Sequence, residues 1–139
     1  MRTTRLALLP ALMLAVSVVC LAGDAAPALV GPQEFQTRLK AAGDQAVLLD
    51  VRTPAEYVAG HLTGALLLNV MDASFERRLE ELPKGRVYFV YCRSGHRSRR
   101  AVKAMQAAGF RHVVELKGGI LAWVSQHMPL CRPAVEVPK

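Results

Sequence analysis

Short apolar runs that favour β-strands alternate with helix-favouring segments through residues 28–128. The connections between them are short, and no internal repeat or low-complexity segment interrupts the pattern. Parallel strands need crossover connections, usually helices, so this alternation favours a parallel sheet with helices on its faces. The pattern therefore predicts one α/β domain.

Strands are predicted at residues 28–30, 47–51, 65–70, 87–91 and 113–116. Helices are predicted at residues 32–42, 54–59, 72–82, 98–108 and 120–128. Asp50 and Cys92 both fall at strand ends, and ligands of open α/β sheets bind outside the carboxyl ends of the strands. The functional site is therefore expected near these two residues.

Residues 92–98, with the sequence Cys-Arg-Ser-Gly-His-Arg-Ser, lie between a predicted strand and a predicted helix. Backbone N–H groups converge at a helix N-terminus, and the helix dipole adds partial positive charge there. Neighbouring arginines add more positive charge. Such surroundings lower the pKa of a cysteine and favour its thiolate. We interpret Cys92 as a nucleophile that acts on an anionic substrate.

The formal net charge of the chain is +7, and much of the excess lies around Cys92. A basic chain of this size could bind nucleic acid, but no recognised motif or aromatic platform accompanies the charge. No paired C-x-x-C is present and the histidines are scattered, so no metal site is expected. We expect a small anion, not nucleic acid, as the partner.

Residues 1–25 have the pattern of a secretory signal peptide. Arg2 and Arg5 precede an apolar stretch over residues 6–22, and small residues follow. We expect cleavage between about residues 22 and 28, and a periplasmic domain without membrane contact afterwards. An uncleaved form, anchored in the membrane and facing the periplasm, is the alternative, although the apolar stretch is near the lower limit for spanning.

The chain has three cysteines, of which Cys20 should leave with the signal peptide. Lipid attachment at Cys20 is disfavoured because Val19 before it is not small. Cys131 belongs to a C-terminal tail predicted at residues 129–139. In an oxidising compartment it could pair with Cys92. Cys131 is interpreted as an incidental thiol, with a resolving or regulatory role as the alternative.

Three ordered motifs resemble signatures of the rhodanese family. The first is Leu-Asp-Val-Arg at residues 49–52, followed by Glu56-Tyr57, Gly60-His61-Leu62, Gly64-Ala65 and Asn69. The second is the loop at residues 92–98, and the third is Gly-Gly-Ile-Leu-Ala-Trp at residues 118–123. The resemblance covers nearly all of residues 28–128. It implies a five-stranded parallel sheet flanked by helices, and thiosulfate sulfurtransferase activity without a cofactor.

The resemblance also implies a mechanism in which Cys92 carries a persulfide. Its thiolate would attack the outer sulfur of thiosulfate, and cyanide or a thiol would then remove that sulfur. The loop expected to bind the substrate consists of Arg93, Ser94, Gly95, His96, Arg97 and Ser98. Loop amides should stabilise the sulfur, and Arg97, with Arg93, should hold sulfonate oxygens. Ser98 is expected to cap the following helix and to hydrogen-bond the sulfur.

The length of the loop separates two related chemistries. Tyrosine and dual-specificity phosphatases have five residues between the loop cysteine and the arginine, and the related cell-cycle phosphatases and arsenate reductases share the fold that the resemblance implies. Here four residues separate Cys92 from Arg97. A smaller ring of amides suits one sulfur atom better than a tetrahedral phosphate. Sulfur transfer is therefore favoured over phosphatase or arsenate reductase activity.

Other residues of the three motifs are expected to support the site. Asp50 and Arg52 should fix loops near it, and Arg52 should form an ion pair with Glu56 across a helical turn. His61 should fix a loop by hydrogen bonding, and Trp123 should pack the last helix onto the sheet.

Three alternatives to a thiosulfate-to-cyanide enzyme stay open at this point. The first is a periplasmic sulfur-relay module that serves a thiol acceptor, and the second is a rhodanese-like binding domain without catalysis. The third and weakest is the phosphatase or arsenate reductase. The expected partners are an anionic sulfur donor and a thiol or cyanide acceptor, and the domain is expected to be a monomer.

Overall fold

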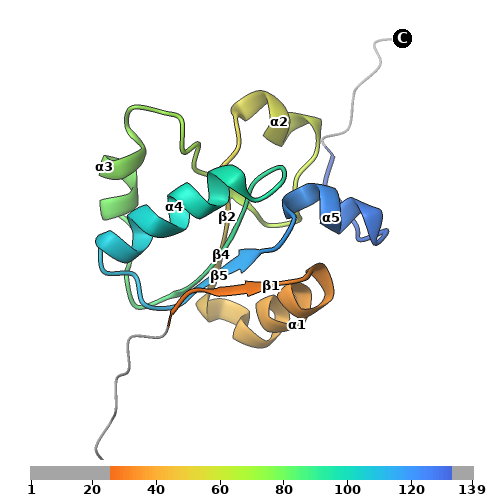
Figure 1. The fold of residues 1–139 in the computed structure, drawn as a ribbon, viewed down its shortest axis with the longest axis horizontal. Coiled ribbons are helices and arrows are strands. Elements are labelled where there is room, and N and C mark those ends of the chain that lie inside the picture. Colours follow the sequence, from red (N-terminus) through yellow and green to blue (C-terminus); the bar gives the residue numbers. More distant parts are fainter. Residues whose placement is uncertain (1–25, 133–139) are drawn as a thin grey trace, which may run out of the picture.

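A computed structural model of the chain describes residues 26–132, which fold into alternating strands and helices. In chain order these are β1 (Ala28–Val30), α1 (Pro32–Ala42), the 3-10 helix η1 (Gly43–Gln45), β2 (Ala46–Asp50), α2 (Pro54–Ala59), β3 (Leu66–Leu67), α3 (Phe75–Glu80), β4 (Val87–Tyr91), α4 (His96–Ala107), β5 (Val113–Leu116) and α5 (Gly119–Ser125). Figure 1 shows this arrangement along the chain.

The strands form one five-stranded sheet in the order β1-β5-β4-β2-β3, and every neighbouring pair is parallel. The predicted five-stranded parallel sheet with helices on its faces is confirmed. β4 lies at the centre, between β5 and β2. In this register Asp50 of β2 lies beside Tyr91 of β4. The carboxyl ends of β2 and β4 therefore meet at one edge of the sheet.

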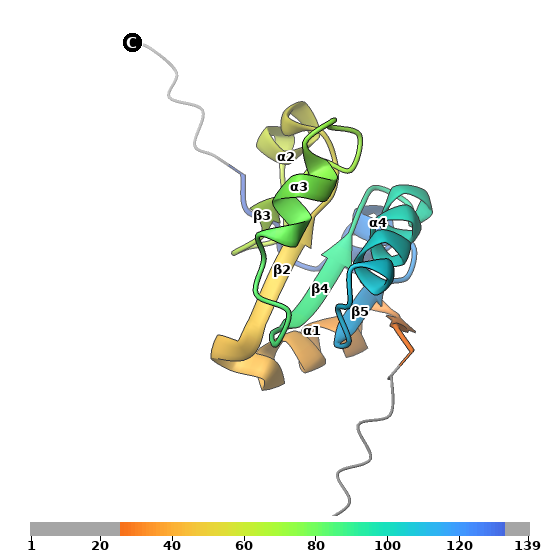
Figure 2. The same cartoon turned by 90° about the vertical axis from the view of Figure 1, so that its left-hand side faces the viewer.

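Helices cover both faces of the sheet (Figures 1 and 2). On one face α3 and α4 bury Phe75, Leu79 and Met105 against β2 and β4. On the other face Phe35 of α1 and Trp123 of α5 pack together with their rings edge to face, 6.3 Å apart between centroids. Trp123 thus packs the last helix onto the sheet, as predicted. Burial of apolar side chains on both faces is what parallel strands require.

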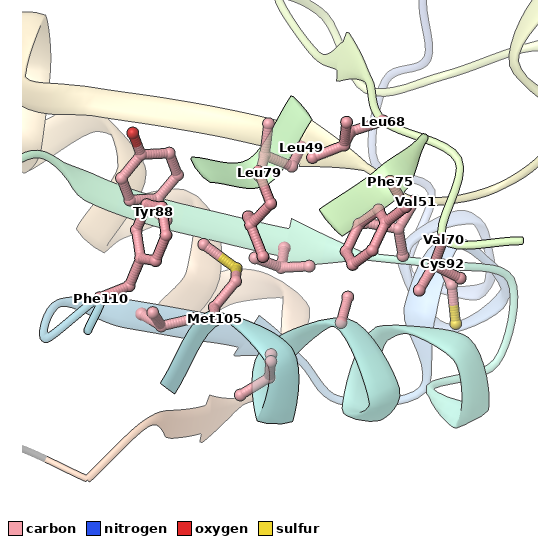
Figure 3. Packing of buried hydrophobic residues seen from close by; sticks show 14 residues of the cluster. Leu49, Val51, Leu68, Val70, Phe75, Leu79, Tyr88, Cys92, Met105 and Phe110 are labelled. Atoms are coloured by element: carbon pink, nitrogen blue, oxygen red, sulfur yellow. The ribbon is translucent and has the colours of Figure 1, made fainter. Parts of the chain in front are cut away.

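One core cluster leads directly to the predicted nucleophile. Figure 3 shows Tyr88 and Phe110 at one end of this cluster and Cys92 at the other, where the side chain of Cys92 points out of the apolar packing. The sulfur therefore lies at the carboxyl edge of the sheet, on a rigid base of packed side chains.

Several elements are shorter than the sequence predicts. Only Leu66–Leu67 pair with β2 as a strand, where residues 65–70 were expected. α3 begins at Phe75 and not at Asp72, because the Asp72 carboxylate accepts hydrogen bonds from the amide and hydroxyl of Ser74 and forms a turn before the helix. α5 ends at Ser125, before the predicted residue 128.

The segment after α5 is tied to the rest of the fold. The indole N–H of Trp123 donates to the carbonyl of Pro129 at 2.9 Å. Cys131 and His61 exchange two backbone hydrogen bonds as an isolated antiparallel bridge. Within residues 26–132 no helix has both the length and the apolar character needed to cross a bilayer. The predicted signal peptide, Cys20 and residues 133–139 lie outside the described residues.

Candidate active site

Cys92 follows β4 directly, and its side chain is 1% exposed. The chain then turns through residues 93–95 into α4, which begins with Gly95 as N-cap in a left-handed conformation (φ 106°). A glycine adopts this conformation without steric cost. The turn therefore brings the first amides of α4 back towards the sulfur.

The sulfur of Cys92 lies among hydrogen-bond donors. The amide of Gly95 donates to Sγ at 3.1 Å, and Sγ lies 3.5 Å from the hydroxyl oxygen of Ser98. Burial by itself raises the pKa of the Cys92 thiol. The hydrogen bond between the sulfur and the Ser98 hydroxyl, together with bonds from the amides of Ser98, Gly95 and Ser94, outweighs burial, so that the pKa of Cys92 is lowered. The site favours an anionic sulfur.

The carbonyls of the same loop point to the first turn of α5. The amide of Ile120 donates to the carbonyl of Cys92 at 2.9 Å, and that of Leu121 to the carbonyl of Arg93 at 3.2 Å. Gly119 lies against these carbonyls, and a Cβ there would be 2.5 Å from each oxygen. The third predicted motif thus holds the backbone of the second.

Arg97 forms a two-pronged ion pair with Glu56 of α2, with both N–O distances 2.7 Å. The bond from Arg97 is the main reason why the pKa of Glu56 is lowered to about 2. The expected Arg52–Glu56 pair is therefore wrong. Glu56 also closes a capping box with Thr53, which turns its carboxylate towards α4.

Arg52 instead folds back onto Asp50, at distances of 2.6 to 3.1 Å between side-chain atoms. The hydroxyl of Tyr91 donates to Asp50 at 2.6 Å and accepts from the amide of Leu62 at 3.0 Å. Arg52 also donates to the carbonyl of Gly60. This buried cluster joins β2, β4 and the loop after α2.

Ser98 does not cap α4, because Gly95 is the N-cap and no side chain caps this helix. The prediction of a cap is wrong for a geometric reason: Ser98 is the third residue of the helix, and its hydroxyl points inward. It lies 2.6 Å from the carboxylate of Glu115, on β5, and 3.1 Å from the carbonyl of Gly95. Sequence reasoning missed Glu115, although a carboxylate inside an apolar strand run was a visible signal.

The remaining loop residues Arg93, Ser94 and His96 are exposed. Arg93 lines an open groove of about 450 Å³ between α2 and α5, together with apolar side chains such as Leu121 and Leu130. His61 contacts the carbonyl of Tyr57 through Nδ1 at 2.8 Å, consistent with the loop-fixing role expected of it. Among residues 26–132 no cluster of three or more His, Cys, Asp or Glu side chains could hold a metal.

Comparison with known proteins places this arrangement in a family. Residues 31–126 match the family described as "Rhodanese-like domain". A protein named "Sulfurtransferase" from Allochromatium vinosum is 38% identical over 90 residues, covering 65% of this chain and 82% of the relative. The "Probable adenylyltransferase/sulfurtransferase MoeZ" of Mycobacterium tuberculosis is 38% identical over 112 residues, covering 78% of this chain. The chain spans only 28% of the length of MoeZ.

Solved structures have the same fold. The rhodanese-like domain of the Alr3790 protein from Anabaena sp. has a TM-score of 0.67 and 30% identity, covering 82% of this chain and 89% of that domain. A rhodanese-related protein from Thermoplasma volcanium has a TM-score of 0.66 at 24% identity, covering 75% and 97% respectively, and shares the fold. The named relatives, at modest identity, support a role in sulfur transfer. The chain is a member of the rhodanese-like domain family.

Proposed function

We propose that this protein is a sulfurtransferase that moves sulfane sulfur from thiosulfate to cyanide or a thiol through a persulfide on Cys92. The observation that carries the proposal is the surroundings of the sulfur, which accepts the Gly95 amide at 3.1 Å and lies 3.5 Å from the Ser98 hydroxyl. Donors arranged around a position of negative charge stabilise a thiolate before reaction and a persulfide anion after it.

In the first step the Cys92 thiolate attacks the outer sulfur of thiosulfate. A new S–S bond forms at Cys92, the S–S bond of thiosulfate breaks, and sulfite leaves with the bonding pair. In the second step cyanide or a thiolate attacks the outer sulfur of the persulfide and restores the Cys92 thiolate. This division into two displacements predicts ping-pong kinetics.

In this proposal Arg93 and Arg97 contribute to binding of the anionic donor in different ways. Arg93 is exposed at the groove beside the loop, and can reach the sulfonate end of a donor. Arg97 already binds Glu56 through two nitrogens. Arg97 therefore contributes to anion binding indirectly. It fixes the position of the loop, and the side of its guanidinium that does not contact Glu56 still presents positive charge.

The engagement of Arg97 also bears on the phosphatase alternative. A phosphatase of this general kind needs the loop arginine for the oxygens of a tetrahedral phosphate. Here that guanidinium is held by a carboxylate, and only four residues separate it from Cys92. Both observations favour a donor that presents one sulfur atom. In a sulfur-relay role the acceptor is a thiol of another molecule. The chemistry at Cys92 is the same, and only the acceptor differs from the reaction with cyanide.

We further propose that the mature domain works as a monomer in the periplasm, after removal of the segment before about residue 28. The signal-peptide pattern in residues 1–25 is the support for this location. N-terminal sequencing of the protein recovered from separate periplasmic and membrane fractions tests it, and a membrane-bound chain that starts at Met1 would support the anchored alternative.

The decisive test is the mass of the protein after incubation with thiosulfate. We expect one added sulfur on the tryptic peptide of residues 87–93, which contains Cys92, and loss of the added mass with cyanide as thiocyanate appears. Cys92→Ser should abolish both, while Cys131→Ser should retain them. Sulfur found only on the peptide with Cys131, or thiocyanate formed by Cys92→Ser, would refute the proposal.

A further inference from the structure

The hydroxyl of Ser98 connects the sulfur of Cys92 with a buried carboxylate. Sγ of Cys92 donates to the hydroxyl oxygen of Ser98 at 3.5 Å, and that oxygen lies 2.6 Å from Oε1 of Glu115. Glu115 is 6% exposed, and Ser98 is fully buried. The three residues come from the end of β4, the first turn of α4 and β5, so three separate elements converge on one short chain of polar atoms.

The number of protons in this chain limits what the Ser98 hydroxyl can do. A serine hydroxyl carries one proton and can donate one hydrogen bond. The Glu115 carboxylate is a stronger and nearer acceptor than the Gly95 carbonyl, which is 3.1 Å away. When Ser98 donates to Glu115, its oxygen is left to accept the proton of the Cys92 thiol. The resting pattern is therefore thiol to hydroxyl to carboxylate.

We propose that Glu115 accepts the proton of Cys92 through Ser98. The S–H bond of Cys92 breaks and its proton passes to Oγ of Ser98, while the original hydroxyl proton of Ser98 passes to Oε1 of Glu115. The products are a thiolate, an intact serine hydroxyl that now donates to sulfur, and a neutral carboxyl. No proton is gained from or lost to solvent, and the total charge of the three groups is unchanged.

This inference rests on the proposed function, because only a thiolate attacks sulfane sulfur. It assigns to Glu115 a positioning role that acts on Cys92 through another side chain. It also gives the buried thiol of Cys92 a route by which to lose its proton. In the second half of the reaction, the same path can return the proton to Cys92 when the persulfide sulfur has left.

Other charged groups also face the sulfur, and the test must be independent of them. Arg97 of α4 interacts electrostatically with Cys92 and is itself paired with the carboxylate of Glu56. Asp50 and Arg52 at the end of β2 neutralise each other. Arg93 and His96 are exposed in the loop, and α5 contributes no titratable side chain within its bounds. Substitutions at Ser98 and Glu115 leave all of these in place.

The experiment measures the alkylation rate of Cys92 by iodoacetamide in the full chain, from about pH 5 to about pH 9. Iodoacetamide is uncharged, so changes in nearby charge do not alter its local concentration. The product is quantified on the tryptic peptide of residues 87–93, which excludes Cys20 and Cys131. The variants are Glu115→Gln, Ser98→Ala and their combination. Glu80→Gln makes the same chemical change at an exposed position of α3 and serves as the control.

An internal proton transfer exchanges no proton with solvent, so the fraction of thiolate that it produces does not depend on pH. Wild type and Glu80→Gln should therefore keep a plateau of alkylation on the acid side. Glu115→Gln should lose this plateau, because Cys92 must then release its proton to solvent. Its Cys92 should be alkylated at least about tenfold more slowly near pH 6. The double variant should be no slower than Ser98→Ala, because both changes interrupt one path.

The opposite result has an equally definite meaning. A carboxylate that is only a neighbour repels the thiolate, so its removal would lower the pKa of Cys92 and accelerate alkylation near pH 6. An unchanged or increased rate in Glu115→Gln would overturn the proposal, as would additive effects in the double variant. If circular dichroism shows that Glu115→Gln is unfolded, Ser98→Ala provides the test. Alkylation kinetics in Ser98→Ala that match wild type would overturn the proposal, and loss of the acid plateau in that variant would support it. Because no sulfur donor is present, these outcomes are independent of whether Cys92 forms a persulfide.

Discussion

Arg97 and Glu56 bind each other through two parallel hydrogen bonds of 2.7 Å, across the space between α4 and α2. Both side chains are about three-quarters buried. The pair ties the first turn of α4, which carries the cysteine loop, to a capping box on another helix. An arginine of the loop is thus held by the protein before any substrate arrives.

The first prediction concerns what remains when one partner is removed. Arg97→Ala leaves the Glu56 carboxylate unpaired beside the loop, where it repels an anionic donor. We expect kcat/KM for thiosulfate to fall by at least about tenfold, mainly through KM. In the double variant Arg97→Ala/Glu56→Gln, kcat/KM for thiosulfate should be several-fold higher than in Arg97→Ala. Steady-state kinetics with cyanide in excess measure both.

The control for this comparison is the exposed pair of Arg77 on α3 and Glu81, the C-cap of that helix, whose N–O distance is 2.9 Å. Arg77→Ala should leave the kinetics unchanged, since exposed pairs contribute little. If the double variant at residues 56 and 97 is as impaired as Arg97→Ala, the repulsion argument is wrong, and Arg97 contacts the donor itself.

The second prediction follows from the pKa of Glu56, which is lowered from 4.5 to about 2, mainly by its bond with Arg97. A carboxyl whose pKa is depressed by folding stabilises the fold fully above its ordinary value, and loses that contribution as the pH falls. We expect the melting temperature of wild type to exceed that of Glu56→Gln at neutral pH. The difference should narrow between about pH 4.5 and about pH 2. A difference that is constant over this range would show that the ion pair adds no stability.

Spacing in the sequence identified the residues of this network but not their partners. Arg52 and Glu56 are four apart, which suits a pair on one helix face. Arg52 precedes the helix, however, and its guanidinium turns back to Asp50, while the capping box directs Glu56 to Arg97. The true partner lies 41 residues away, and local spacing contains no information on that distance.

The third prediction tests the cluster of Asp50, Arg52 and Tyr91. Tyr91→Phe removes a hydroxyl that donates to Asp50 and accepts from the amide of Leu62. The cost should be about 1–3 kcal/mol, because the Leu62 amide is left without this partner. Asp50→Ala should cost more, about 3–5 kcal/mol, since Arg52 is then buried without its counter-charge. Denaturant unfolding measures both, and the reverse order would contradict this account.

The fourth prediction concerns Gly119, at φ 60°, where a Cβ would lie 2.5 Å from the carbonyl oxygens of Cys92 and Arg93. Gly119→Ala should destabilise the fold and slow alkylation of Cys92. The matched control is Gly109→Ala, at φ 87° with no atom within 4 Å of its Cβ. It should show only the conformational cost of about 1–2 kcal/mol. Equal effects of the two substitutions on alkylation would exclude the contact as the cause.

The fifth prediction addresses Cys131, which is partly exposed and joined to His61 through backbone hydrogen bonds. Its side chain takes no part in those bonds, so Cys131→Ser should leave both the fold and the activity under reducing conditions intact. Rates with and without a reductant, for wild type and variant, measure this. A loss of more than about tenfold would make Cys131 a partner of Cys92 in turnover.

The sheet and the cysteine loop were predictable because both depend on local patterns. Apolar runs marked the central strands, and Cys92 stood at the end of one of them. Glu115 was not identified because its environment depends on β5 lying beside β4, with Ser98 of α4 directed at both. A carboxylate within Val113–Leu116 contradicts the apolar pattern of that strand. Such exceptions in buried runs are where function can be sought in similar sequences.

The hydrogen bonds from Ile120 and Leu121 to the carbonyls of Cys92 and Arg93 also make the loop depend on residues that are synthesised later. The ribosome makes the cysteine loop before it makes α5. Until those later residues have emerged and packed, the loop carbonyls lack these two amide donors. A nascent or truncated chain that ends before residue 118 therefore contains the complete loop sequence without the two amides that fix its carbonyls. The backbone around the thiol is thus completed by residues that are synthesised after it.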